Sequence, residues 1–214
     1  MKCSFFLILA VSVVSNAGVI IEGMVKLPAG RSSAAAAARY QQKSGAVALP
    51  EPPSAVVFLE GSFPASAPPS TPTNQVSQKN FQFMPALLPV RTGASVVFPN
   101  LDDDFHHVCS YSKTKKFDLG RYRKEEEKQP VVTFDKPGTV KIGCEIHDHM
   151  QAVILVLDTP HFVKTDAEGK YQLTIKNIPA GKYVLKAWVD DRNVQQQTVE
   201  LKEGSKVRAD FPGK

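Results

Sequence analysis

Short apolar runs of strand length recur along the chain and set its predicted architecture. Residues 18–27 and 54–60 are rich in β-branched and apolar side chains, and each run ends at a turn containing glycine or proline. These features predict two strands. The alanine-rich segment 31–42 predicts a short exposed helix or a loop, and four prolines in residues 64–73 predict an extended surface connector.

From residue 80 onward, the apolar runs become shorter and more closely spaced. Turn residues such as Thr92-Gly93 and Pro137-Gly138 separate them, which is typical of a β-sandwich or a barrel. The charged segment 121–128 is predicted to be a solvated loop. The strands expected in this part are residues 81–83, 86–89, 95–98, 107–111, 131–134, 139–144 and 152–157.

After residue 158 the apolar and polar positions alternate regularly. Tyr171, Leu173 and Ile175 share one face of an expected strand, and residues 183–189 alternate in the same way after a turn. Alternation with a period of two predicts strands with one buried and one exposed face. With further strands near residues 199–201 and 207–211, this part predicts a small antiparallel sheet.

The first residues indicate export from the cytoplasm. Met1-Lys2 is followed by the apolar run 3–14 and then by small residues, the pattern of a secretory signal peptide over residues 1–17. The apolar run is shorter than a membrane-spanning helix requires, and no later stretch is long enough. We therefore expect a periplasmic or secreted protein with no membrane span, which loses Cys3 with its signal peptide.

The charge balance is mildly basic, with 26 Lys and Arg against 21 Asp and Glu. These charges are spread along the chain and do not form a patch with interleaved aromatic residues, so nucleic-acid binding is not expected. Removal of Cys3 leaves Cys109 and Cys144 in an oxidising compartment, where a pair of cysteines is by default a candidate disulfide. A role of Cys144 as a metal ligand competes with that default.

Soft sulfur and imidazole groups occur close together immediately after an expected strand. Cys144, His147 and Met150 follow the spacing C-x2-H-x2-M. A thiolate and two histidines in one plane, with a weak axial methionine, suit copper in both of its oxidation states. The second histidine has to come from another strand, and the adjacent pair His106 and His107 can supply it.

Two parts of the sequence together resemble the cupredoxin family of small blue-copper proteins. In that family a strand of the form V-x-F-x-N precedes a ligand histidine, and a later C-x-x-H-x(2–4)-M loop supplies the other ligands. Residues 97–108 match the first part and residues 144–150 the second, with the short loop most similar to that of amicyanin. The resemblance covers residues 80–157 and implies a Greek-key β-sandwich. It also implies one copper ion, bound by His106, Cys144, His147 and Met150.

Three alternatives stay open around this ligand set. The family's histidine is commonly followed by Asn, which favours His106, whereas strand alternation with Cys109 favours His107. His149 is interpreted as a spectator, with a competing ligand and an exposed residue for partner contact as the alternatives. A disulfide between Cys109 and Cys144 would consume the thiolate and abolish a blue-copper centre.

The C-terminal segment resembles the carboxypeptidase regulatory-like domains, which are small transthyretin-like β-sandwiches. The pattern T-D-x-x-G-x-[YF]-x-L begins at Thr165, and I-P-x-G-x-Y-x-L begins at Ile178. The resemblance implies a fold without catalytic residues. The usual opening strands are missing after residue 158, and residues 18–61 can supply them. Insertion of the cupredoxin-like domain into this sandwich is therefore an alternative to a plain tandem arrangement.

The predicted fold class is all-β, with a cupredoxin-like Greek-key sandwich and a small transthyretin- or immunoglobulin-like sandwich after a signal peptide. Trp188 is expected in a core and not on a binding surface. The predicted division is a signal peptide (1–17), N-terminal strands (18–61), a proline-rich connector (62–79), a cupredoxin-like domain (80–157) and a regulatory-like sandwich (158–214).

One mononuclear site without a second catalytic constellation favours electron transfer over catalysis. No Ser-His-Asp arrangement, phosphate-binding loop or carboxylate pair stands out, and Asp102-Asp103-Asp104 is interpreted as a solvated loop. We expect a non-enzymatic copper protein that passes one electron between exported redox partners. The alternatives are a non-redox β-sandwich binding or scaffold protein and a periplasmic protein for copper storage or delivery.

Overall fold

The computed structural model describes residues 18–30, 49–61, 63, 74–126 and 129–213. The predicted signal peptide, the alanine-rich segment and the prolines of residues 64–73 lie outside these ranges. In the described part, strands supply the regular structure apart from one 3-10 turn, η1 (Lys124–Glu126), so the predicted all-β class is confirmed. None of the described residues belongs to a helix with the length and apolarity needed to cross a bilayer.

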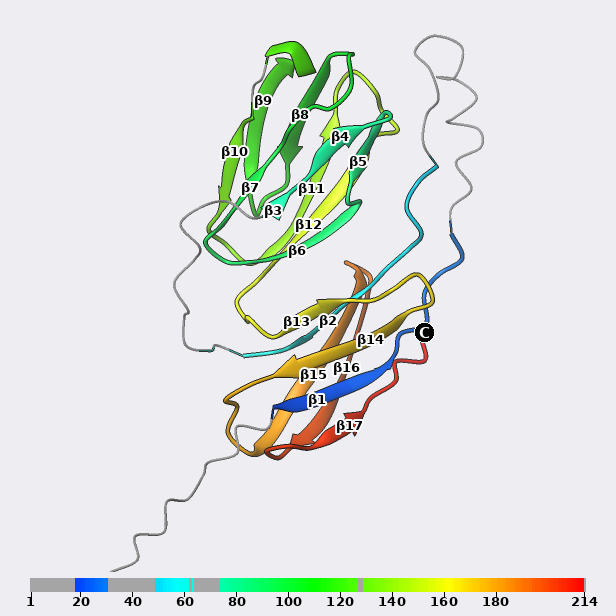
Figure 1. Ribbon diagram of the computed structural model, residues 1–214, viewed down its shortest axis with the longest axis vertical. Helices are drawn as coiled ribbons and strands as arrows, with labels where there is room; N and C mark the ends of the chain where they lie inside the picture. Colours follow the sequence, from blue (N-terminus) through cyan, green and yellow to red (C-terminus); the bar gives the residue numbers. More distant parts are fainter. Residues whose placement is uncertain (1–17, 31–48, 62, 64–73, 127–128, 214) are drawn as a thin grey trace, which may run out of the picture.

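The first sandwich, residues 74–157, consists of two sheets and a hairpin (Figure 1). A five-stranded sheet has the order β6-β12-β11-β8-β9, with β6 and β12 parallel, and a three-stranded sheet has the order β10-β7-β3. Strands β4 and β5 form the hairpin. The bounds are β3 (Asn74–Gln75), β4 (Ser77–Lys79), β5 (Gln82–Met84), β6 (Leu87–Arg91), β7 (Ala94–Val97), β8 (His106–Tyr111), β9 (Lys116–Tyr122), β10 (Val131–Phe134), β11 (Gly138–Cys144) and β12 (Gln151–Leu157).

Alternating burial directs one face of each strand into the core of this sandwich. In β10, Val132 and Phe134 are buried while the residues between and before them are exposed, as the period of a strand requires. Both sheets contribute to one continuous apolar cluster. Cys144 and Met150 belong to that cluster, so two of the predicted ligands are anchored among tightly packed apolar side chains.

Strand β9 corrects the prediction of a solvated loop at the start of the segment 121–128, because Arg121 and Tyr122 belong to the strand. Residues 124–126 form the turn η1, and residues 127–128 lie outside the described residues. The last residue of β9, Tyr122, is fully buried, donates a hydrogen bond to the Phe98 carbonyl at 2.7 Å and accepts one from the Gln78 amide at 2.7 Å. The outward face of β9 carries lysine, aspartate and arginine side chains. These charged residues mask the sequence pattern of an edge strand, whose inward face packs on the core.

The second sandwich consists of residues 19–24 and 56–59 together with the chain after residue 161. Its sheets have the orders β14-β1-β17 and β13-β2-β15-β16, so β1 and β2 each lie between two strands from the C-terminal part. Strands β3 to β12 are therefore enclosed, along the sequence, between two parts of one sandwich. The bounds are β1 (Val19–Met24), β2 (Val56–Leu59), β13 (Phe162–Lys164), β14 (Lys170–Ile175), β15 (Gly181–Asp190), β16 (Asn193–Leu201) and β17 (Lys206–Arg208).

A small apolar cluster joins the two sandwiches. Trp188 of β15 is 8% exposed and packs with Leu155 and Leu157 at the far end of β12, as expected for a core tryptophan. Beside this cluster, the Asp191 carboxylate accepts a hydrogen bond from the Thr139 hydroxyl at 2.6 Å. The outer face of the five-stranded sheet is thus covered by the second sandwich at one end.

We predict that Gly23→Ala destabilises the protein because β1 is packed tightly against the chain that follows β17. A Cβ atom at position 23 would lie 1.9 Å from the Ala209 carbonyl oxygen, a backbone atom that cannot rotate away. We expect the free energy of unfolding to fall by about 3 kcal/mol, measured by chemical denaturation. Gly30→Ala is the control, because its Cβ meets Pro53 at an ordinary 3.6 Å. Equal stability of the two variants would contradict the position of β1 in this sheet.

Candidate metal centre

Three potential ligand side chains meet at one end of the first sandwich. His106 is the first residue of β8, Cys144 is the last residue of β11, and His147 lies in the turn that follows. The Cys144 Sγ atom lies 4.0 Å from His106 Nδ1 and 3.8 Å from His147 Nδ1, and the two Nδ1 atoms are 3.2 Å apart. Among the described residues, these three form the one group of potential ligands close enough to share a metal ion.

The two adjacent histidines face opposite sides of the five-stranded sheet. His106 is fully buried, whereas the His107 ring lies on the outer face, with Nε2 2.6 Å from Asp118 and Nδ1 3.5 Å from Glu145. His107 and Cys109 are two residues apart in β8 and share one face of the strand. Alternation would therefore favour His107 as a ligand only if Cys109 faced the core, but Cys109 lines the pocket on the outer face. The structure therefore brings His106, and not His107, to Cys144.

Both described cysteines are free thiols. In the sheet, Cys109 is opposite Gly143, and Cys144 is opposite Val108. Because successive residues of a strand point to opposite faces, the side chains of Cys109 and Cys144 lie on opposite faces of the sheet. That geometry explains why the alternative of a disulfide between them is not realised.

The surroundings of Cys144 favour its thiolate form. Burial alone would raise the pKa of the Cys144 thiol, but hydrogen bonds from the His106 ring and from nearby backbone N–H groups outweigh that effect and lower the pKa. One of these donors, the backbone N–H of His107, lies 3.4 Å from Sγ. A lowered pKa makes loss of the thiol proton easier, and the thiolate is the form that binds a metal.

Asp102 fixes the orientation of the His106 ring and was missed by the interpretation of residues 102–104 as a solvated loop. Its Oδ2 atom lies 2.9 Å from His106 Nε2, so Nε2–H donates to the carboxylate while Nδ1 faces Cys144. Burial alone would lower the pKa of His106, but the hydrogen bonds to Asp102 and Cys144 outweigh burial and raise that pKa, so the metal-free ring can donate from both nitrogens. Burial opposes ionisation of Asp102, but hydrogen bonds from His106 and from the backbone N–H groups of Phe81 and Asn80 lower its pKa. The spacing of four residues before His106 was the available signal.

His147 and His149 differ in their partners. Burial lowers the pKa of His147, and the positive charges of nearby His106 and His149 lower it further, which favours the neutral imidazole that binds metals. His149 donates a hydrogen bond from Nε2 to the Phe81 carbonyl oxygen at 3.0 Å. The ligand group found among the described residues does not include His149, which supports its interpretation as a non-ligand.

Met150 is fully buried and belongs to the same apolar cluster as Cys144. Its backbone N–H donates to the His147 carbonyl at 3.0 Å, and its carbonyl accepts from the Cys144 N–H at 3.2 Å. These two bonds close the short loop that carries the sulfur and imidazole groups. The thioether is therefore held in the core on the same loop as Cys144 and His147.

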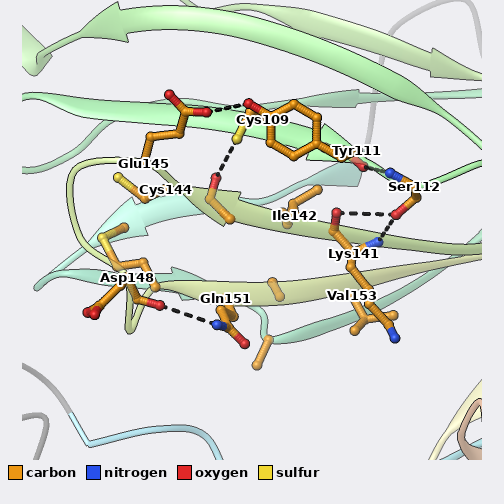
Figure 2. A pocket seen from close by; sticks show the side chains of 15 residues that line it. Cys109, Tyr111, Ser112, Lys141, Ile142, Cys144, Glu145, Asp148, Gln151 and Val153 are labelled. Atoms are coloured by element: carbon orange, nitrogen blue, oxygen red, sulfur yellow. Dashed lines mark hydrogen bonds between the residues drawn. The ribbon is translucent and has the colours of Figure 1, made fainter.

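A pocket of about 890 Å³ lies on the outer face of the five-stranded sheet, next to Cys144 (Figure 2). Tyr111 donates its hydroxyl hydrogen to Glu145, and this bond together with the carboxylate charge raises the pKa of Tyr111 to about 12. Burial raises the pKa of the Cys109 thiol, which donates to the Gly143 carbonyl at 3.7 Å. Cys109 therefore stays protonated at neutral pH and is separate from the ligand group.

The donor chemistry fits copper. Two imidazole nitrogens and a thiolate within 4.0 Å of one another form a soft trigonal set, and the buried thioether on the same loop can add a weak fourth interaction. Hard oxygen-binding ions such as calcium and magnesium prefer carboxylates and carbonyl oxygens, so this set does not suit them.

No protein-family model matches the chain, and no curated protein matches it. Several solved structures are similar over part of it, including the following three. The copper-containing nitrite reductase NirK from Thermus scotoductus SA-01 is 22% identical, with a TM-score of 0.38. The match covers 46% of this chain and 25% of the nitrite reductase chain. A purple cupredoxin from Nitrosopumilus maritimus is 18% identical with a TM-score of 0.35, covering 39% of this chain and 99% of its own. A mutant of amicyanin, in its Cu(I) form, is 19% identical with a TM-score of 0.37, covering 47% of this chain and 98% of its own.

We predict that Asp102→Ala destabilises the metal-free protein because it leaves the buried His106 ring and two backbone N–H groups without their acceptor. The carboxylate accepts hydrogen bonds from His106 and from two backbone N–H groups, so the free energy of unfolding should fall by about 3 kcal/mol. Asp103→Ala is the matched control, because the Asp103 side chain is 84% exposed, and its loss should cost less than about 0.5 kcal/mol. Chemical denaturation with a chelator present measures both. Equal losses would show that Asp102 has no special role.

Proposed function

We propose that this chain is an exported type 1 copper protein that carries one electron at a time between redox partners. The observation that carries the proposal is the free Cys144 thiol, with its lowered pKa, placed within 4.0 Å of one nitrogen from each of His106 and His147. The alternative of a non-redox scaffold protein with a disulfide between Cys109 and Cys144 is less well supported, because both thiols are free.

In this proposal His106, Cys144 and His147 would hold one copper ion, and Met150 would offer its thioether as a weak fourth ligand. Copper supplies a Cu(II)/Cu(I) couple when bound. The chain's own residues hold the ligands rigid, because Asp102 fixes the His106 ring and the N–H of His107 bonds the Cys144 sulfur. Ligands that cannot relax between the two oxidation states favour fast electron transfer.

The proposed architecture is a cupredoxin-like domain inserted into a second β-sandwich. The sequence predicts this domain over residues 80–157, but β3 and β4 extend it back to residue 74, so residues 74–79 are not part of the predicted connector. The pairing of β1 with β14 and β17, and of β2 with β13 and β15, supports the insertion over the tandem arrangement. We assign residues 158–214, completed by residues 18–61, as a carboxypeptidase regulatory-like sandwich on the sequence motifs that begin at Thr165 and Ile178. That domain is proposed to have a structural role without catalysis.

The proposed partner is an exported redox protein that docks where the ligand loops reach the surface. Leu101 and Phe105, each 43% exposed, flank the 102–104 loop that leads to His106. Exposed apolar side chains beside a metal site can be covered by a partner that approaches closely enough to exchange an electron. Export is proposed from the signal-peptide pattern of residues 1–17.

Copper titration followed by visible absorption tests the proposal. We predict an intense blue or purple colour at one copper ion per chain, since a thiolate bound to Cu(II) gives strong sulfur-to-copper charge transfer. Cys144→Ser should abolish the colour. Cys109→Ala should retain it, because that thiol lies on the opposite face of the sheet. Tight binding of colourless Cu(I) that Cu(II) cannot replace would favour copper storage or delivery, and no binding would refute both copper functions.

Met150→Leu tests the proposed axial ligand. The thioether is expected to be a long, weak ligand, so the variant should keep copper at one ion per chain. Its reduction potential should rise, because a lost sulfur donor destabilises Cu(II) more than Cu(I). Metal analysis and voltammetry measure the two effects. An unchanged potential would remove Met150 from the proposed ligand set.

A further inference from the structure

The turn between β4 and β5 has a backbone conformation that its sequence does not favour. Asn80 and Phe81 both adopt left-handed conformations, with φ of 51° and 58°. Asparagine tolerates this region, but a bulky aromatic residue is an outlier there, and two-residue turns of this kind usually place glycine second. Such a conformation persists only where the surrounding structure holds it, and it often marks a functional constraint.

The groups that hold this turn come from the two loops that carry the proposed ligands. The Asp102 carboxylate accepts hydrogen bonds from the N–H groups of Asn80 and Phe81, at 2.6 Å and 3.0 Å. On its other side, the Phe81 carbonyl accepts the hydrogen bond from His149 Nε2 at 3.0 Å. Asp102 precedes His106 by four residues, and His149 lies within the second ligand loop.

The turn places the Phe81 ring against both histidines of the site. Its centroid lies 5.1 Å from that of His147 and 5.6 Å from that of His106, with interplanar angles of 86° and 81°. The ring is only 5% exposed. Edge-to-face packing against both imidazoles restricts their rotation and excludes water from this side of the site.

We propose that His149 is a positioning residue for the metal centre: by bonding the Phe81 carbonyl, it holds the Phe81 ring across His106 and His147. This inference rests on the proposed copper function and deepens it. It also gives His149 a role other than that of spectator or competing ligand. The extra histidine acts through Phe81, and its ring centroid lies 6.1 Å from that of His147.

The first measurement is hydrogen exchange of the Asn80 and Phe81 amides in the metal-free protein. His149→Leu removes the donor and should speed exchange at both amides, because the turn opens more often. His149→Gln should restore slow exchange, because its side-chain amide can donate to the same carbonyl. His161→Leu is the control for loss of an imidazole outside the site, where His161 packs against Phe63, and it should leave both rates unchanged.

The second measurement uses the copper-loaded protein. In His149→Leu, water that enters past a displaced Phe81 ring should stabilise Cu(II), so the charge-transfer band should shift and the reduction potential should fall. His149→Gln and His161→Leu should match the wild type. Phe81→Leu removes the aromatic ring but leaves the backbone carbonyl for His149, so it should shift the band and the potential in the same direction without needing the His149 variant to fold.

The two measurements separate failure of this inference from failure of the proposed function. If His149→Leu matches the wild type in amide exchange, or if Phe81→Leu leaves the band and potential unchanged, the positioning role of His149 is wrong. If the wild type gives no charge-transfer band with copper, the copper function fails. In that case the exchange rates of the metal-free variants still decide whether His149 holds the turn.

Discussion

A buried thiol whose surroundings favour its deprotonated form is the constraint on which the first sandwich depends. Cys144 is 6% exposed and packs within the main apolar cluster, where an uncompensated charge would be strongly unfavourable. The chain compensates with hydrogen bonds from the His107 N–H and the His106 ring, and Asp102 in turn binds His106. The same groups that make the buried thiolate tolerable also fix the geometry of the proposed ligands.

The closeness of the proposed ligands Cys144 and His147 could be predicted from the sequence because it depends on local spacing. Cys144, His147 and Met150 lie on one short loop, and a turn of that length must keep them close. The choice between His106 and His107 was different, since periodicity shows that two faces exist but not which face is buried. Cys109 is an apolar residue that lines the pocket of Figure 2 on the outer face. Because an apolar residue is expected to face the core, alternation alone favoured His107, which shares the face of Cys109 and lies away from Cys144.

Features that depend on contacts distant in sequence could not be predicted. The charged residues of β9 did not indicate a strand, because this strand is defined by its pairing with β8. The fully buried Tyr122 at its end is hydrogen-bonded to Phe98 and Gln78, which precede it by 24 and 44 residues. Asp102 has two exposed neighbours in a run of three aspartates, and only its spacing from His106 distinguishes it locally. Its role depends on the hairpin turn about 20 residues earlier, whose two N–H groups need an acceptor.

The placement of the second sandwich restricts where the proposed redox partner can approach. Trp188 covers the outer face of the first sandwich at Leu155 and Leu157, whereas Met150 and the ligand loop lie at the opposite end of β12. Leu155 and Leu157 follow Met150 by five and seven residues, which is about 16 to 23 Å at the usual rise per residue, so these contacts with Trp188 lie away from the proposed copper site. In the proposed function, the ligand-bearing end is left for a partner, and the second sandwich can stabilise the first without blocking electron transfer.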